Sequence, residues 1–337
     1  MIYLLAVIFL SIIVLVHEFG HFCLAKSFRV KVEEFGLGYP PCIFSKKLGG
    51  TKYSINAIPF GGFNKISETD LLRQPPLHKS AIFLGGVLFN LMLGFLLFVM
   101  VSLIGTDPVL LINKVFPGSP AEQAGLQVQD QIINLSYGQQ RLDFPFTGEQ
   151  MIQFLNQQAG KKITLKIRRN GNILTKSIVP RVSPPSGEGK LGIGFFDAGI
   201  PKQSFLGSLA VATRRTFWVI RATLQGLYKI ITQSFVKPEL LQDVVGPVGM
   251  VFFAYKIGQI GLIYLVQVMA SISVGLAVFN LLPFPALDGM FLVYTAIEKI
   301  KGRPLSKKIV STINAYGFIF LLILAILLVF KDIRMVL

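Results

Sequence analysis

Four long hydrophobic stretches dominate the chain, and each is long enough for a helix that crosses a lipid bilayer. Such a helix needs about 20 predominantly apolar residues. The sequence predicts membrane-spanning helices over residues 2–24, 80–104, 262–282 and 309–330. Residues 107–198 are more polar, with short alternating segments between turn residues, which predicts strands and short helices. The pattern therefore indicates a polytopic α-helical membrane protein that carries one small α/β domain.

The segment between the first two spans has a strand pattern. Residues 52–58 alternate between apolar and polar side chains, Pro59 ends the alternation, and Gly61-Gly62-Phe63 turns the chain again. We expect a membrane-associated β-hairpin or small sheet that offers an edge to an extended peptide. The pattern is equally compatible with a plain cytoplasmic hairpin.

The polar region has its own start and stop signals. Ser119 and Thr147 are expected to cap two short helices. Asn170-Gly171, between residues 163–169 and 173–179, predicts a β-hairpin. About 90 residues of this kind are enough for a complete domain.

Residues 205–235 are hydrophobic but carry cations at helical spacing. Arg214, Arg221 and Lys229 fall on one side, and Trp218 lies on the remaining surface. This arrangement favours an amphipathic helix in the membrane interface over another crossing, which stays the alternative.

Composition and charge fit a membrane protein. Of the 337 residues, 52% are hydrophobic and 15% charged, and the net charge is +16. Lys and Arg gather in short loops beside the spans, so the charge indicates cytoplasmic loops and no nucleic-acid partner. We expect both termini outside, residues 25–79 in the cytoplasm, and the α/β domain outside. The first span lacks a cleavage site and is expected to be retained. Two cysteines give no disulfide framework.

The first span ends in a motif that fits metal chemistry. His17 and His21 lie four residues apart, on one face of the predicted helix, where both imidazoles can reach one zinc ion. Glu18 lies beside them and can act as general base on a water molecule. A chance match, or polar side chains that join helices, is the alternative. Ionisable groups inside a span are costly and usually functional, which favours the metal site.

A third candidate ligand follows the third span. Pro283 and Pro285 end that helix, so Asp288 is expected on irregular backbone at membrane depth, on the same side as the histidines. By itself an Asp-Gly pair indicates a turn. A catalytic zinc site needs three protein ligands and one open position, and His17, His21 and Asp288 supply the three.

These motifs resemble the site-2 protease family of intramembrane zinc metalloproteases, and more closely its bacterial regulator-of-sigma-E type. The resemblance rests on His17–His21, on the stretch NLLPFPALDG at 280–289, and on a single domain between the second and third spans. That domain resembles a PDZ domain around Pro117–Ala121. Gly246-Pro247-Val248-Gly249 is similar to the break that precedes the family's third span.

The resemblance implies roles for individual residues. His17, His21 and Asp288 match zinc ligands, Glu18 matches the catalytic base, and Asn280 matches a residue that handles substrate. The hairpin, which resembles the family's membrane-entering β-hairpin, is expected to bind substrate through these residues: Tyr53, Ile55, Gly61, Gly62 and Phe63.

The sequence also departs from the family pattern at two positions. Gln129 replaces a frequent glycine of such PDZ domains, and Val87 replaces a usual proline of the second span. Neither position belongs to the expected zinc site.

The resulting expectation is a zinc metalloprotease of the bacterial inner membrane that cuts transmembrane segments of single-pass proteins, such as anti-sigma factors or remnant signal peptides. The expected division of the chain is 1–106 for two spans and the hairpin, 107–198 for the PDZ-like domain, 199–260 for interfacial helices, and 261–337 for the last two spans. The active site is expected near the cytoplasmic side. The rival functions are an inactive membrane scaffold, which would bind no stoichiometric metal, and a divalent-metal transporter, which would need a polar path on both sides of the site.

Overall fold

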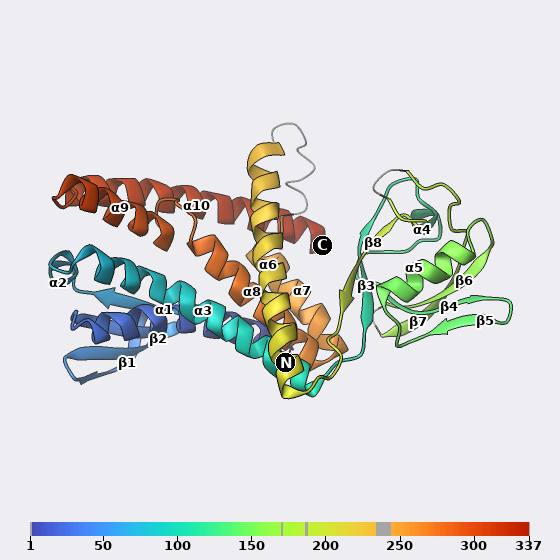
Figure 1. Ribbon diagram of the computed structural model, residues 1–337, viewed down its shortest axis with the longest axis horizontal. Helices are drawn as coiled ribbons and strands as arrows, with labels where there is room; N and C mark the ends of the chain where they lie inside the picture. The colour runs from blue at the N-terminus through green and yellow to red at the C-terminus, as the bar shows by residue number, and fades with distance from the viewer. Residues whose placement is uncertain (1, 170, 186–187, 234–243, 337) are drawn as a thin grey trace. The chain divides into compact units, whose positions relative to one another are not determined.

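The computed structural model describes residues 2–169, 171–185, 188–233 and 244–336. The chain forms two compact units: Met1–Met100 with Leu206–Leu337, and Val101–Phe205. Figure 1 shows helices gathered in the first unit and most strands in the second.

The predicted membrane helices are present. Within the described ranges, four helices are long and apolar enough to cross a membrane. They are α1 (Ile2–Ser27), α3 (Pro76–Ile104), α8 (Leu262–Asn280) and α10 (Lys307–Val336). The four predicted spans are thereby confirmed as candidate membrane helices, with ends that differ by a few residues.

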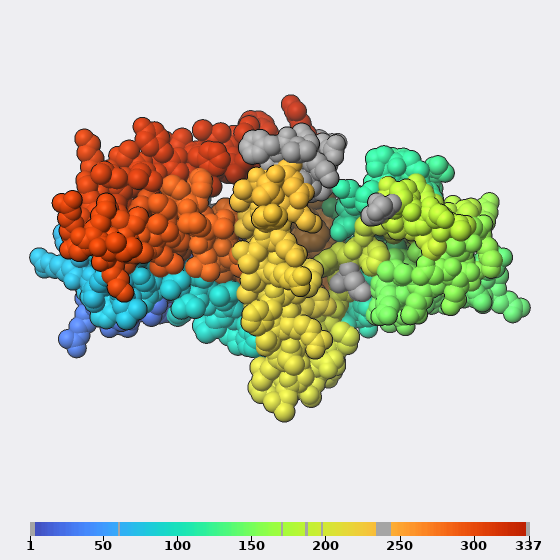
Figure 2. All heavy atoms as spheres, turned by 45° about the horizontal axis from the view of Figure 1, so that its top comes forward, coloured from blue at the N-terminus to red at the C-terminus, as the bar shows by residue number. Residues whose placement is uncertain are grey.

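Helix α6 (Phe205–Gln233) is not among these four candidates. In Figure 1 it runs across the direction of α10, and in Figure 2 it is exposed along its length. Phe217 and Trp218 are exposed large hydrophobic side chains on this helix. By length and composition α6 is thus not a candidate span, and its place at the interface stays a prediction.

Two shorter helices were not predicted from the sequence, α2 (Glu68–Leu72) and α9 (Asp288–Lys301). Helix α7 (Pro247–Ile260) lies within residues 199–260, where helices were expected. Helix α9 corrects one prediction, because Asp288 is its first residue and does not lie on irregular backbone. The prolines do end α8, but only six residues of turn and bend follow Leu281 before the next helix begins. An acidic side chain is favourable at a helix N-terminus, where the backbone N–H groups are unpaired.

Helices α1 and α3 approach each other through glycines. A Cβ atom at Gly20 would lie 2.2 Å from the carbonyl oxygen of Gly85, and a Cβ at Gly85 would lie 2.6 Å from the carbonyl oxygen of Gly20. Small residues allow this close backbone contact in membrane helices, where packing replaces the hydrophobic effect. The pair sets the spacing of α1 and α3 just beside the histidines.

The sheet between α1 and α3 is larger than the sequence indicated. Strand β1 (Val32–Leu48) pairs with β2 (Thr51–Ile66) across a turn at Gly49-Gly50, where both residues have positive φ. Phe35 pairs with both Tyr53 and Asn64, so the first half of β1 lies between two segments of β2. Register shifts bend both strands and make this possible.

The second unit contains a sheet and two helices. The strands are β3 (Val109–Val115), β4 (Gln131–Tyr137), β5 (Gln140–Asp143), β6 (Ile163–Arg169), β7 (Asn172–Ile178) and β8 (Ile193–Ala198). Their order is β7-β6-β4-β3-β8, and β5 pairs with β4. Ile132, Leu135 and Leu165 are fully buried in its core.

The predicted caps of this unit are confirmed. Ser119 caps α4 (Pro120–Gln123), and Thr147 forms a capping box at α5 (Gly148–Gln157). The hairpin of β6 and β7 is also present, although Asn170 in its turn lies outside the described residues.

The turn at Gln129 keeps a glycine-like conformation without a glycine. Gln129 has φ 75°, and the next residue, Asp130, is buried and anchored. The Arg169 guanidinium donates to the two oxygens of Asp130 at 2.7 and 2.8 Å, and this hydrogen bonding raises the pKa of Arg169. The anchored carboxylate explains how the turn tolerates its strained residue.

Adding a methyl group at the α1–α3 contact is predicted to destabilise the protein. Gly20→Ala should lower the free energy of unfolding by about 1–3 kcal/mol, the usual cost of overpacking. Gly226→Ala in α6 is the control, because no atom lies within 4 Å of its added Cβ. Thermal unfolding of both metal-free variants in detergent measures the difference. Equal melting temperatures for Gly20→Ala and the wild type would contradict the packing account.

Candidate metal centre

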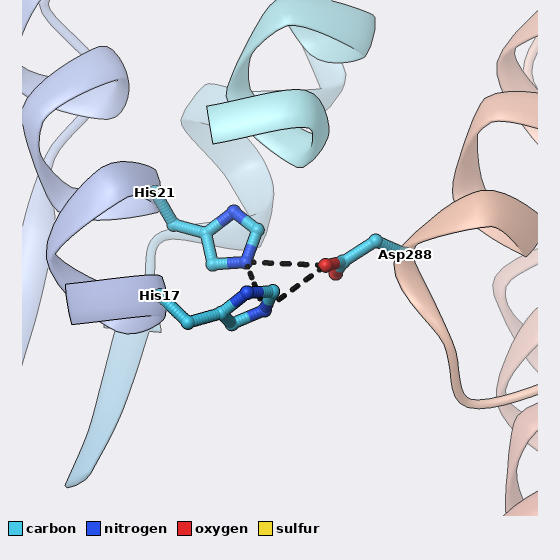
Figure 3. Close-up of side chains that lie close together, drawn as sticks. All are labelled: His17, His21 and Asp288. Carbon is cyan, nitrogen blue, oxygen red and sulfur yellow. Dashed lines mark hydrogen bonds and ion pairs between the residues drawn. The ribbon is translucent and has the colours of Figure 1, made fainter. Parts of the chain in front are cut away.

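Three side chains from distant parts of the chain converge in the first unit, which contains the four candidate membrane helices. His17 and His21 extend from α1, and Asp288 extends from the start of α9 (Figure 3). The Nε2 atoms of the two histidines lie 3.1 Å apart, and Asp288 Oδ2 lies 3.1 Å from His17 Nε2 and 3.5 Å from His21 Nε2. The predicted ligand set therefore occupies one place.

The triangle of donor atoms has the size of a zinc site. In a tetrahedral site with bonds of about 2.0–2.1 Å, neighbouring ligand atoms lie about 3.3 Å apart. Two imidazole nitrogens and one carboxylate oxygen are also a donor set that zinc prefers. Asp288 Oδ2 is buried and makes no hydrogen bond with any described residue, although both imidazoles are near. A buried carboxylate oxygen without a hydrogen-bond donor is consistent with a site for a cation at the centre of the triangle.

The orientation of His21 is fixed by α3. Its Nδ1 lies 2.8 Å from the backbone carbonyl oxygen of Ile82. Because a carbonyl oxygen accepts only, Nδ1 carries the proton, and Nε2 keeps its lone pair for the centre of the triangle. Outer contacts of this kind orient metal-binding histidines in proteins.

Space for the two rings comes from Gly86 on α3. A Cβ atom at this position would lie 2.5 Å from His17 Cε1 and 2.6 Å from His21 Nε2. Any side chain other than hydrogen would therefore displace both imidazoles. From the sequence, Gly85 and Gly86 of the second span indicate close helix packing, but no local pattern shows that Gly86 makes room for the imidazoles.

The end of α8 meets the start of α9 through another glycine. A Cβ at Gly289 would lie 2.2 Å from the carbonyl oxygen of Leu281. The intervening turn is held by Asn314 of α10, whose Oδ1 accepts from the Ala286 N–H at 3.1 Å. These contacts fix the backbone on both sides of Asp288.

The three donor atoms line a cavity of about 370 Å³. Glu18 and Asn280 also line it, and Asn280 Nδ2 lies 3.4 Å from His17 Nε2. The predicted base and one predicted substrate residue therefore share the cavity with the ligand set. Its other lining residues are all apolar: Val14, Phe83, Leu276, Ala286 and Leu287.

The remaining predicted substrate residues lie on β2, outside the lining of this cavity. The Cβ positions of Gly61 and Gly62 lie 3.0 Å from Val14 Cγ1 and 3.1 Å from Leu15 Cδ1, so this segment packs on α1 less than one turn from His17.

Of the other three predicted substrate residues, Phe63 and Tyr53 contact aromatic side chains and Ile55 faces outward. Phe63 stacks on Tyr39, with ring centroids 6.4 Å apart, and Tyr53 packs against Phe22 at 6.1 Å. Ile55 is half exposed. Their role in substrate binding stays a prediction.

Asn90 lies in α3, within the span that the sequence predicts over residues 80–104. It is fully buried, it does not line the cavity, and its backbone carbonyl accepts from the Ser273 hydroxyl of α8 at 2.8 Å. This contact links α3 to α8.

Gly86→Ala is predicted to weaken zinc binding about tenfold or more, because the added methyl group displaces the imidazoles without removing a donor. Gly275→Ala in α8 is the control, since its nearest neighbour would lie at an ordinary 3.7 Å. Competition with a chromophoric chelator measures both affinities. Wild-type affinity in Gly86→Ala would disprove the packing role of this glycine.

Comparisons with known proteins cover nearly the whole chain. A protein of Clostridium perfringens is 30% identical over 97% of this chain and 97% of its own length. A protein of Clostridium acetobutylicum is 30% identical over 98% and 96%. Both are provisionally named zinc metalloproteases. Zinc metalloprotease RasP of Geobacillus kaustophilus is 25% identical over 96% and 95%.

The model of peptidase family M50 matches residues 5–324, a range that includes both halves of the converging ligand set. The family resemblance seen in the motifs is thereby confirmed, and the chain belongs to peptidase family M50.

Proposed function

We propose that this protein is a zinc metalloprotease that hydrolyses peptide bonds inside the membrane. Its substrates are transmembrane segments of single-pass proteins, such as anti-sigma factors or remnant signal peptides. The observation that carries the proposal is the triangle of His17 Nε2, His21 Nε2 and Asp288 Oδ2, with sides of 3.1–3.5 Å, in a cavity that Glu18 also lines. Membership of a peptidase family supports it.

His17, His21 and Asp288 would hold the zinc ion, which leaves one position open to water and substrate. When bound, zinc lowers the pKa of a water molecule to about 7 and polarises a carbonyl group. Glu18 takes the proton of the attacking water and delivers it to the leaving amine. Its place next to His17 in α1, on the cavity wall, keeps the carboxylate within the same small volume as the ligands.

Asn280 has a place suited to substrate. Asn280 is the last residue of α8. Its side chain lines the cavity, and its Nδ2 atom lies 3.4 Å from His17 Nε2. An amide group can donate to a peptide carbonyl and accept from a peptide N–H. We therefore assign Asn280 to orienting the scissile peptide beside the ligands.

A substrate helix must unwind before it is cut, because its carbonyl groups are hydrogen-bonded within the helix. The segment Gly61-Gly62-Phe63 offers a support for the unwound strand. Gly62 and Phe63 pair with β1 on one side, and no described strand pairs with their other edge. An extended peptide added there would run beside α1 near His17. Tyr53 and Ile55 lie in the other segment of β2, across β1 from Gly62 and Phe63, and stay further candidates for side-chain contacts with substrate.

We assign the β-rich residues 107–198 to a PDZ-like domain outside the inner membrane, with the metal centre nearer the cytoplasmic side. Such a domain excludes substrates with bulky outer parts or docks their trimmed ends. Residues 199–260 would lie at the interface, where the exposed aromatic side chains of α6 fit a lipid boundary.

Glu18→Gln is predicted to reduce cleavage of a model single-pass substrate by about a hundredfold or more while zinc stays bound, because the amide cannot accept the proton. Glu33→Gln, which changes an exposed carboxylate of β1, is the control. Gel analysis of cleavage and metal analysis of the purified proteins measure both effects. Retained cleavage by Glu18→Gln would refute the assignment of the base, and absence of stoichiometric zinc in the wild type would favour the inactive scaffold.

A further inference from the structure

A buried ion pair joins α3 to α9 away from the metal centre. Lys79 Nζ lies 2.9 Å from Glu298 Oε2, and the two side chains are only 9% and 14% exposed. The other oxygen, Glu298 Oε1, accepts from the Leu305 N–H at 2.9 Å. Buried charges are costly unless they are paired and hydrogen-bonded, and each of these charges has its partners.

Both charges lie at unfavourable helix ends. Lys79 is in the first turn of α3, where the helix dipole disfavours a cation, and Glu298 is in the last turn of α9, where it disfavours an anion. The helix dipole and solvent exposure therefore do not account for a lysine and a glutamate at these two positions. Their mutual contact across 219 positions of the chain does.

The ion pair belongs to one stripe on α3. Lys79, Ile82, Phe83 and Gly86 have the spacing of a single helix face. Ile82 holds His21 Nδ1, Gly86 makes room for both imidazoles, and Phe83 stacks on Phe291 of α9 with ring centroids 4.5 Å apart. The same face therefore contacts the helix that carries the histidines and the helix that carries Asp288.

The partner residues form a matching stripe on α9. Phe291 follows Asp288 by three positions and Glu298 follows Phe291 by seven, so the three share one face. The helix rises about 1.5 Å per residue, which puts Glu298 about 15 Å along the axis from Asp288. The ion pair touches no ligand, and any effect on Asp288 passes through the position of α9.

We propose that Lys79 and Glu298 are positioning residues that fix the register of α9 on α3 and so hold Asp288 opposite His17 and His21. A slide of α9 by one turn, about 5.4 Å, would leave apolar side chains in contact but would separate the ion pair and withdraw Asp288. Buried ion pairs are well suited to specifying register, even where they add little stability. The inference rests on the proposed function, since it concerns the ligand set of that site.

The experiment compares four variants: Lys79→Gln, Glu298→Gln, the charge swap Lys79→Glu/Glu298→Lys, and Lys307→Gln. The last is the matched control, because Lys307 and Glu68 form an exposed pair at 3.5 Å, with side chains 60% and 81% exposed. Zinc affinity is measured by chelator competition. Spin labels at Leu77 and Ile300, which are 78% and 86% exposed, measure the α3–α9 distance in zinc-free protein with Cys23 and Cys42 replaced by serine.

Each single change is expected to broaden or lengthen the α3–α9 distance distribution and to weaken zinc binding about tenfold. The charge swap should restore most of both, because it rebuilds the ion pair with each charge at a favourable helix end, although the introduced lysine cannot accept from the Leu305 N–H. Lys307→Gln should change neither. Restoration by the swap separates a register effect from general loss of folding.

The proposal is overturned if the single variants match Lys307→Gln in distance and affinity, or if the swap restores neither. These results are distinct from a failure of the proposed function. A wild-type protein that binds no zinc would reject the metalloprotease while the spin-label distances still tested the register. Normal zinc binding with unchanged distances would reject the positioning role alone.

Discussion

Two imidazoles and a carboxylate lie close together among apolar helices, and the cost of removing them from water is the constraint on which the rest of the fold depends. Ionisable groups inside membrane helices are unfavourable by several kcal/mol unless something binds or pairs them. Here His17 and His21 direct their Nε2 atoms at Asp288 Oδ2 within 3.1–3.5 Å. A cation among the three atoms would offset the cost for all of them at once. The three groups must then be held together by the packing of largely apolar helices.

The helices hold the three groups together by close packing at glycine residues, which have no side chain to keep neighbouring backbones apart. Gly20 and Gly85 bring the backbones of α1 and α3 into contact, Gly86 leaves room for the imidazoles, and Gly289 lets α9 begin against the end of α8. Helix α3 is the shared support, because Ile82 orients His21 while Phe83 packs on α9. The site is therefore built on close-packed helices, which hold catalytic geometry more tightly than loops do.

The sequence predicted the parts of this site that depend on local spacing. His21 follows His17 by four positions, so a helix alone places them on one face. The pair of prolines before Asp288 indicated the end of α8, and apolar runs indicated the four membrane helices. The caps at Ser119 and Thr147 were equally local, and both are present.

The parts that sequence reasoning missed depend on contacts between distant segments. Asp288 begins α9, and α9 contacts α3 through Phe83–Phe291 and Lys79–Glu298, which no local pattern records. The length of β1 follows from pairing with two segments of β2, and its own residues show little alternation. The role of Gly86 depends on which helix faces it. For the same reason the substrate contacts of Tyr53, Ile55 and Phe63 stay predictions, since their partner is another molecule.

The most direct test of the account is X-ray absorption at the zinc edge on detergent-purified protein loaded with one equivalent of zinc. The account predicts a four-coordinate ion with nitrogen and oxygen donors at about 2.0–2.2 Å, including two imidazoles, and the loss of one imidazole contribution in His21→Ala. Sulfur scattering near 2.3 Å, or a spectrum that His21→Ala leaves unchanged, would contradict it.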